Sequence, residues 1–171
     1  LERVAGSTLS VSDLELAELG KLDCTSYKGD GFEPHGVMSL RDTLAYCQAI
    51  ARDIEFLVEI KSSFRQDIGY ISRLVSDTIS ELQAAGANFR ILSFDLRVIE
   101  TASAFLPPER LVLNIEDKES LDIFIRRIST NLLSAIGLNQ ELCEREVLED
   151  LEGRGFEVIA WTVNSVERYR E

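Results

Sequence analysis

A short apolar segment at residues 56–61 ends in two opposite charges, Glu59 and Lys61. Side chains alternate between the two sides of a β-strand, so Leu57, Glu59 and Lys61 share one side and the opposite side is wholly apolar. The apolar side suits burial beneath a helix. The other side turns charged at the carboxyl end of the strand, which is where parallel α/β proteins usually carry their chemistry. The alternative is a strand that simply ends in solvent.

Three other polar features deserve the same weighing. His35 is the only histidine, and we interpret it as a loop histidine with no chemical role because it lies between Pro34 and Gly36. Asp95 follows a second apolar segment, and we assign it no metal role. Glu116 and the residue after it resemble the acidic start of a helix, which the helix dipole favours.

The composition limits the classes of function. A length of 171 residues suits one domain with a real core. The net charge of −12 argues against a general nucleic-acid binder, although a metal ion can reverse the field locally for a small phosphate substrate. The three cysteines, Cys24, Cys47 and Cys143, have neither zinc-site spacing nor a disulfide pattern, which favours a reducing compartment and hence the cytoplasm. No apolar stretch has transmembrane length.

Strand-like and helix-like segments alternate along the chain, which predicts parallel strands joined by crossover helices. The expected strands are 56–61, 89–94, 111–115, 132–136 and 156–161. The expected helices are 13–19, with Ser12 as its N-cap, then 39–51, 68–85, 96–105, 121–128, 139–152 and a last one that starts after Ser165. A flavodoxin-like open sheet has about this number of strands, whereas a (β/α)₈ barrel has eight. We favour an incomplete barrel because no glycine-rich phosphate loop follows any strand.

Six segments in order resemble the glycerophosphodiester phosphodiesterase family. Each segment is weakly specific alone, and together they span the whole chain. They are LER at 1–3 followed by Gly6, LAELGKLD at 16–23, MSL at 38–40, VEIK at 58–61, LSFD at 92–95 and WTVN at 161–164. The segment at 38–40 lacks a proline that the family usually carries.

The resemblance implies a TIM barrel of the phospholipase-C-like phosphodiesterase type. It also implies that the first two strands and the last strand are absent from this chain, and that the two catalytic histidines precede Leu1. We therefore expect residues 1–171 to form a single incomplete barrel domain, with a small helix-plus-loop insertion at about 10–38. No catalytic residue of the family falls within the chain.

The family hydrolyses glycerophosphodiesters to glycerol 3-phosphate and an alcohol, with a divalent cation and two histidines as acid and base. The resemblance places Glu59 at a metal-ligand position, and oxygen ligands suit Mg²⁺ or Ca²⁺. It places Lys61 near the phosphate and Trp161 against the substrate, with core packing as the alternative for Trp161. The expected partner is thus a small phosphodiester, with no nucleic acid and no membrane span.

The chain by itself is expected to be inactive, because each general acid or base contributes roughly 10²–10⁴-fold to the rate. Two alternatives stay open. One is a non-catalytic binding domain of the same fold, and the other is a related phosphodiesterase that acts on phosphoinositides or sphingolipids. Missing strands would also leave open barrel edges through which the chain could self-associate.

Overall fold

The structure is a computed structural model, and it describes residues 2–29, 31–51 and 53–167. The chain divides into two compact units, Leu1–Arg52 and Asp53–Glu171. The insertion predicted at about 10–38 lies within the first unit. Its relation to a single barrel domain stays a prediction.

Short helices and a pinned loop make up the first unit. Its elements are α1 (Glu2–Ala5), η1 (Val11–Asp13), α2 (Leu16–Leu19), η2 (Ser26–Lys28) and α3 (Leu40–Ile50). The predicted start of α3 is confirmed, because the Ser39 side chain accepts a hydrogen bond from the Asp42 amide. The loop that holds His35 is fixed by its backbone, since the Cys24 amide donates to the His35 carbonyl at 2.8 Å.

The helix predicted at 13–19 with Ser12 as its cap is wrong. Leu14 is extended and separates η1 from α2. The reason is local capping: the Asp13 carboxylate accepts a hydrogen bond from the Ser10 amide, and the Glu18 carboxylate accepts one from the Glu15 amide. Each acidic side chain closes its own short turn, so no continuous helix forms.

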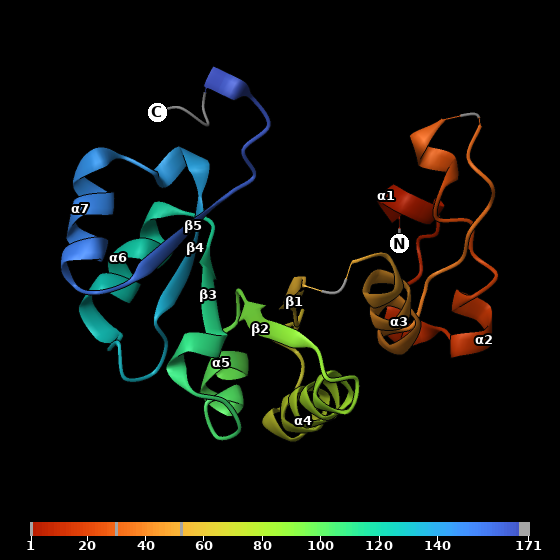
Figure 1. Cartoon of the computed structure of the whole chain (residues 1–171), viewed down its shortest axis with the longest axis horizontal. Coiled ribbons are helices and arrows are strands. Elements are labelled where there is room, and N and C mark those ends of the chain that lie inside the picture. The colour runs from red at the N-terminus through yellow and green to blue at the C-terminus, as the bar shows by residue number, and fades with distance from the viewer. Residues whose placement is uncertain (1, 30, 52, 168–171) are drawn as a thin grey trace. The chain divides into compact units, whose positions relative to one another are not determined.

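The second unit is a five-stranded sheet whose strands are all parallel. The strands are β1 (Glu55–Glu59), β2 (Asn88–Ser93), β3 (Leu111–Ile115), β4 (Ala135–Asn139) and β5 (Glu157–Trp161). They neighbour one another in sequence order, β1-β2-β3-β4-β5 (Figure 1). A doubly wound sheet reverses its strand order at a switch point, whereas a barrel does not. The sheet is therefore an arc of a (β/α)₈ barrel, and the incomplete barrel is confirmed.

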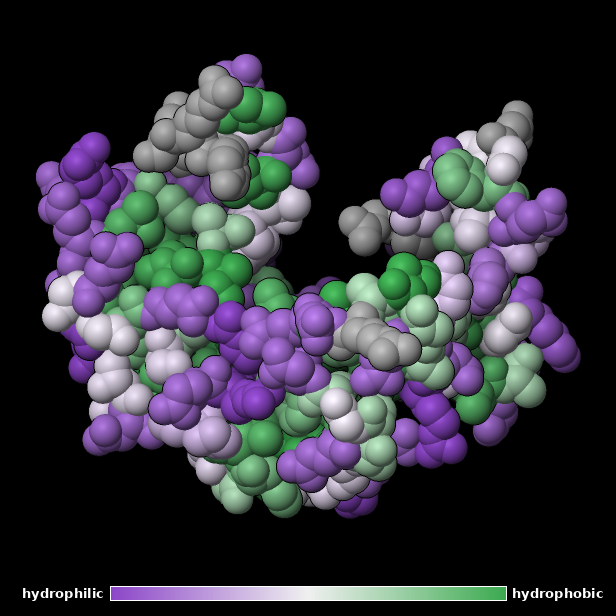
Figure 2. Space-filling view, viewed as in Figure 1, coloured by the Kyte–Doolittle hydropathy of each residue, from purple (hydrophilic) through white to green (hydrophobic). Residues whose placement is uncertain are grey.

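Helices connect the strands and lie on one side of the sheet, as right-handed crossovers between sequential strands require (Figure 1). They are α4 (Ile68–Ala84), α5 (Leu96–Ala102), α6 (Lys118–Arg127) and α7 (Arg145–Gly153). In Figure 2, hydrophilic residues cover the outer side of α7, and apolar residues reach the surface between this helix and the strands. No helix in the described ranges is long and apolar enough to cross a membrane.

The register gives the sheet two unlike faces. The helix-facing side is apolar and supplies core residues such as Ile91, Leu113 and Ile136, whereas Phe56 and Val58 of β1 on the same side are only half-buried. The other side, which we call the inner face, carries polar groups. Its residues are Glu55, Leu57, Glu59, Asn88, Arg90, Leu92, Val112, Asn114, Ala135, Gly137, Asn139, Glu157, Ile159 and Trp161.

Two boundaries near β4 differ from expectation. The strand predicted at 132–136 runs instead from Ala135 to Asn139, and the helix predicted from 139 begins at Arg145. Asn139 ends the strand and its side chain accepts a hydrogen bond from the Glu141 amide, which makes a 3₁₀ turn, η4 (Gln140–Leu142). That turn delays the helix. Most of the helix expected after Ser165 lies outside the described residues.

Candidate functional site

A cavity of about 750 Å³ opens where β1, β2 and β3 end. It is lined by Glu59, Ile60, Lys61, Ser62, Phe64, Ser93, Phe94, Asp95, Leu96, Arg97 and Glu116. These residues come from the carboxyl ends of the three strands and from the segments that follow them. The cavity therefore occupies the end of the arc at which barrel enzymes bind their substrates.

Glu59 and Lys61 both line this cavity, although the strand predicted at 56–61 ends at Glu59 and Lys61 lies in the segment that follows it. The Lys61 Nζ is 3.6 Å from Glu59 Oε1, and the two side chains are 81% and 30% exposed. An ion pair this exposed contributes little to stability, on the order of 0–1 kcal/mol. The pair therefore leaves both charges accessible to a ligand, with the ammonium toward solvent and the carboxylate deeper in the cavity.

Trp161 is half-buried on the inner face and does not line the cavity. Its ring packs edge-to-face on Phe94, a cavity residue, with 5.4 Å between ring centroids. Gly137 lies between Trp161 and Asn114, and a methyl group at Gly137 would overlap the Asn114 side-chain oxygen. The indole Nε1 is buried with no hydrogen-bond partner among the described residues. The contact between Trp161 and a substrate remains a prediction, because Phe94 lines the cavity and Trp161 packs behind it.

Asp95 is a structural carboxylate at the cavity wall. It caps α5 by accepting a hydrogen bond from the Arg97 amide at 2.9 Å, and it forms an ion pair with Arg97 Nη2 at 2.6 Å. The Ser62 hydroxyl donates to Asp95 Oδ2, the same oxygen that pairs with Arg97 Nη2. These contacts, Arg97 first, hold the pKa of Asp95 below its usual value, although burial opposes the shift. The carboxylate is thus charged and fully engaged by protein groups.

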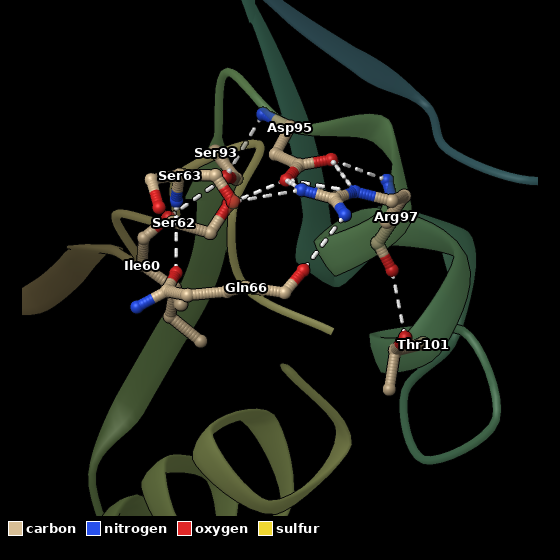
Figure 3. Close-up of polar contacts among 8 residues, drawn as sticks. All are labelled: Ile60, Ser62, Ser63, Gln66, Ser93, Asp95, Arg97 and Thr101. Atoms are coloured by element: carbon tan, nitrogen blue, oxygen red, sulfur yellow. Dashed lines mark hydrogen bonds and ion pairs between the residues drawn. The ribbon is translucent and has the colours of Figure 1, made fainter. Parts of the chain in front are cut away.

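Arg97 reaches from α5 to the segment that follows β1 (Figure 3). We call residues 60–67 the site loop, because it carries Lys61 and Phe64. Arg97 Nη1 donates to the Gln66 carbonyl and Nη2 to the Ser63 carbonyl, both at 3.1 Å. Beside it, the Ser93 hydroxyl donates to the Ile60 carbonyl at 2.7 Å.

A divalent cation needs several oxygen ligands, six to eight in the case of Ca²⁺. Within the described ranges, no group of three or more His, Cys, Asp or Glu side chains lies close enough to hold a metal ion. Glu59 can supply one carboxylate, and Asp95 is occupied by Arg97 and Ser62. The described residues alone do not form a metal centre, so Glu59 remains a predicted single ligand.

Sequence reasoning placed the two charges and missed the groups around them. Arg97 follows the capping Asp95 by two residues, a spacing that by itself indicates only a helix start. Phe64 lies in a polar loop segment and gave no periodic signal. One sequence feature does point to Phe64: it is the single apolar residue in the polar segment SSFRQD at 62–67. A lone apolar side chain in such a segment is expected to stay at the surface, where the structure places it.

Solved structures share this fold. The chain superposes with a TM-score of 0.80 and 17% identity on an Oleispira antarctica phosphodiesterase solved with its product sn-glycerol-3-phosphate, covering 98% of this chain and 66% of that one. A Silicibacter pomeroyi protein assigned as a glycerophosphoryl diester phosphodiesterase gives 0.80 and 18%, covering 96% and 63%. A glycerophosphodiester phosphodiesterase of Parabacteroides distasonis gives 0.67 and 12%, covering 88% and 59%.

No family model matches the chain, and no curated protein matches its sequence. The chain spans 66% and 63% of the length of the first two of these structures, and the shared identity is low. What is shared is the architecture: these 171 residues have the fold of the glycerophosphodiester phosphodiesterases.

Proposed function

We propose that the cavity at the ends of β1, β2 and β3 is part of the active centre of a glycerophosphodiester phosphodiesterase. One observation carries the proposal: Glu59 and Lys61 project into one cavity at the carboxyl end of a strand, in a fold shared with phosphodiesterases. The substrate would be a glycerophosphodiester, hydrolysed to glycerol 3-phosphate and an alcohol.

The two charged groups suit complementary parts of that reaction. The Lys61 ammonium, mostly exposed, can donate hydrogen bonds to phosphoryl oxygens and offset their negative charge. The Glu59 carboxylate can supply one oxygen ligand to Mg²⁺ or Ca²⁺, a cation that would polarise the phosphoryl group. Because Glu59 is the one ligand assigned in this chain, we expect its cation binding to be weak.

Binding of the product tests the proposal. We expect sn-glycerol 3-phosphate with Mg²⁺ to shift the amide resonances of residues 59–62 in the wild-type chain. Lys61→Met should weaken this binding about tenfold, roughly 1.4 kcal/mol. Lys118→Met is the matched control, because it removes the same charge from a residue that does not line the cavity. Equal effects of the two substitutions, or no binding by the wild type, would refute the proposal.

Turnover by the chain itself is a separate question. The chain holds one histidine, and His35 lies in the first unit outside the cavity lining. We therefore expect no release of glycerol 3-phosphate from glycerophosphocholine by the 171 residues alone. Metal-dependent release would show that another group serves as acid or base. Binding without turnover would fit both this proposal and a non-catalytic binding domain.

We also propose self-association through the sheet edges. Within the described ranges, β1 and β5 each pair with a single strand, so one side of each backbone offers unpaired hydrogen-bonding groups. Sedimentation velocity over a hundredfold range of concentration should show a growing dimer fraction. A monomer at every concentration would exclude this association.

A further inference from the structure

We propose that Arg97, anchored on Asp95, is a positioning residue that fixes the site loop and so places Lys61 and Phe64 at the cavity. The functional meaning of that placement rests on the proposed binding of a phosphodiester by Lys61. The structural claim, that one guanidinium sets the loop, stands on the contacts alone and is tested separately below.

Arg97 uses its planar fork on two different targets. Nε lies 3.0 Å from Asp95 Oδ1 and 3.1 Å from Oδ2, and Nη2 lies 2.6 Å from Oδ2. The two terminal nitrogens also donate to the carbonyls of Ser63 and Gln66. A lysine donates all its hydrogen bonds from one nitrogen, so it cannot reach the Asp95 carboxylate and both loop carbonyls at the same time.

Asp95 makes the anchor rigid because it is itself held from two elements. It caps α5 through the Arg97 amide, and it accepts the Ser62 hydroxyl from the site loop. Its own amide donates to the Ser93 hydroxyl, which in turn donates to the Ile60 carbonyl. The loop is therefore tied to the end of β2 at its start and to α5 at its middle.

The two carbonyls that Arg97 binds lie on either side of Phe64, and their positions explain why this side chain faces the cavity. Ser63 and Gln66 bracket the loop tip, and the Ser63 amide also donates to the Gln66 side chain at 2.8 Å. Between them, Phe64 is 86% exposed although it lines the cavity. The Phe64 ring is therefore not part of the core, and it can contact a ligand that binds in the cavity. Lys61, two residues before Ser63, is set by the same ties.

The loop positioning can be measured by hydrogen exchange in the full 171-residue chain. Arg97→Lys keeps the charge and removes the fork. We expect the Ser63 and Gln66 amides, which are hydrogen-bonded within the loop, to exchange about tenfold faster while the β-strand amides stay protected. Arg110→Lys is the control, because Arg110 also donates to a backbone carbonyl, that of Phe89, away from the cavity.

Asp95→Asn provides a second route should Arg97→Lys disturb folding, since asparagine caps helices as well as aspartate does. It should also speed exchange at Ser63 and Gln66. Exchange within twofold of wild type at both amides in either folded variant would overturn the positioning role. The same result in Arg110→Lys as in Arg97→Lys would overturn it as well.

A titration with sn-glycerol 3-phosphate connects the loop to the proposed function. Arg97→Lys should weaken binding about fivefold, because Lys61 would no longer be held at the cavity. If the wild-type chain does not bind sn-glycerol 3-phosphate, the proposed function fails, while the exchange data still decide whether Arg97 positions the loop. If the wild type binds and Arg97→Lys binds equally well with a loosened loop, the link between loop and ligand is refuted.

Discussion

Two arginines of the same strand–helix unit hold opposite ends of the sheet in different ways. Near the amino ends of the strands, Arg90 lies on the inner face with its side chain 16% exposed, between two carboxylates. Its Nη2 is 2.9 Å from Glu55 of β1, and its Nη1 is 2.7 Å from Glu157 of β5. At the carboxyl ends, Arg97 binds one aspartate of its own helix start and two carbonyls of a loop.

The difference lies in what each arginine connects. Arg90 joins β1 to β5, the first and last strands of the arc, so it stabilises the curvature of the sheet. The neighbouring carboxylates, Glu55 first, raise the pKa of its guanidinium, in keeping with a permanent charge. Arg97 joins two neighbouring segments and fixes a local shape. We infer that the amino end of the arc is built for stability and the carboxyl end for placing ligand-binding groups.

Removing Arg90 should have the largest effect. Arg90→Met would leave Glu55 and Glu157 facing each other on the inner face without the cation between them. Because both carboxylates are partly exposed, we expect a loss of about 2 kcal/mol in the free energy of unfolding, within the usual range for charged hydrogen bonds. Urea denaturation measures this loss, and exchange in the site loop should not change.

A triple variant controls for the charge balance. Adding Glu55→Gln and Glu157→Gln to Arg90→Met removes the repulsion, so about half of the lost stability should return. If the triple variant is as unstable as Arg90→Met, the lost stability comes from packing of the arginine side chain. The claim that the Arg90 ion pairs stabilise the sheet would then be wrong.

The barrel arc could be predicted from the sequence because short apolar strand segments alternate with segments whose apolar residues recur at helical spacing. The sequence also predicted that Glu59 and Lys61 lie near each other, although Lys61 comes after the end of β1 and its position is set by the site loop and not by alternation along the strand. It did not predict the contacts of Arg90 or Arg97. The partner Glu157 is 67 residues from Arg90, and only the register of five strands brings the two together.

The predicted ends of helices and strands were wrong where a polar side chain accepts a hydrogen bond from a nearby backbone amide. Asn139 and Asp13 each redirect a turn, and propensity alone does not reveal which amide such a side chain will bind. Trp161 shows another limit of the sequence pattern. The pattern placed it correctly at a strand end, but the open space beside it depends on Gly137 of the neighbouring strand.

Gly137→Ala tests the inner face near the carboxyl ends. The new methyl group would overlap the Asn114 side-chain oxygen, which has to rotate, and it would contact Trp161 at 3.5 Å. We expect a loss of about 1 kcal/mol, at the low end for overpacking because a side chain rather than backbone must move. The emission of Trp161, the only tryptophan, should shift. Unchanged emission with full stability would show that this layer is loosely packed.

Asp95→Asn should produce a smaller effect that depends on pH. The pKa of Asp95 is lowered in the folded chain, so its stabilising contribution is complete above the ordinary aspartate pKa and is lost as the pH falls through the lowered value. At neutral pH we expect a difference of about 0.5 kcal/mol from wild type, because the pair is partly exposed. Urea midpoints should converge in acid. Asp117→Asn makes the same change at the N-cap of α6, outside the 750 Å³ cavity, and should leave site-loop exchange unchanged at every pH.

Replacing Phe64 should have the smallest effect on stability and the most selective effect on binding. Phe64→Ala removes an exposed ring, so the free energy of unfolding should change by less than about 0.5 kcal/mol. If the pinned loop holds this ring against the alcohol part of a ligand, the affinity for a glycerophosphodiester with an aromatic alcohol should fall severalfold, and that for sn-glycerol 3-phosphate should not. Phe105→Ala, half-exposed and outside the cavity lining, is the control. An equal loss for both ligands would mean that Phe64 shapes the loop and makes no contact with the alcohol, and the carboxyl end would then resemble the amino end more closely than the two arginines suggest.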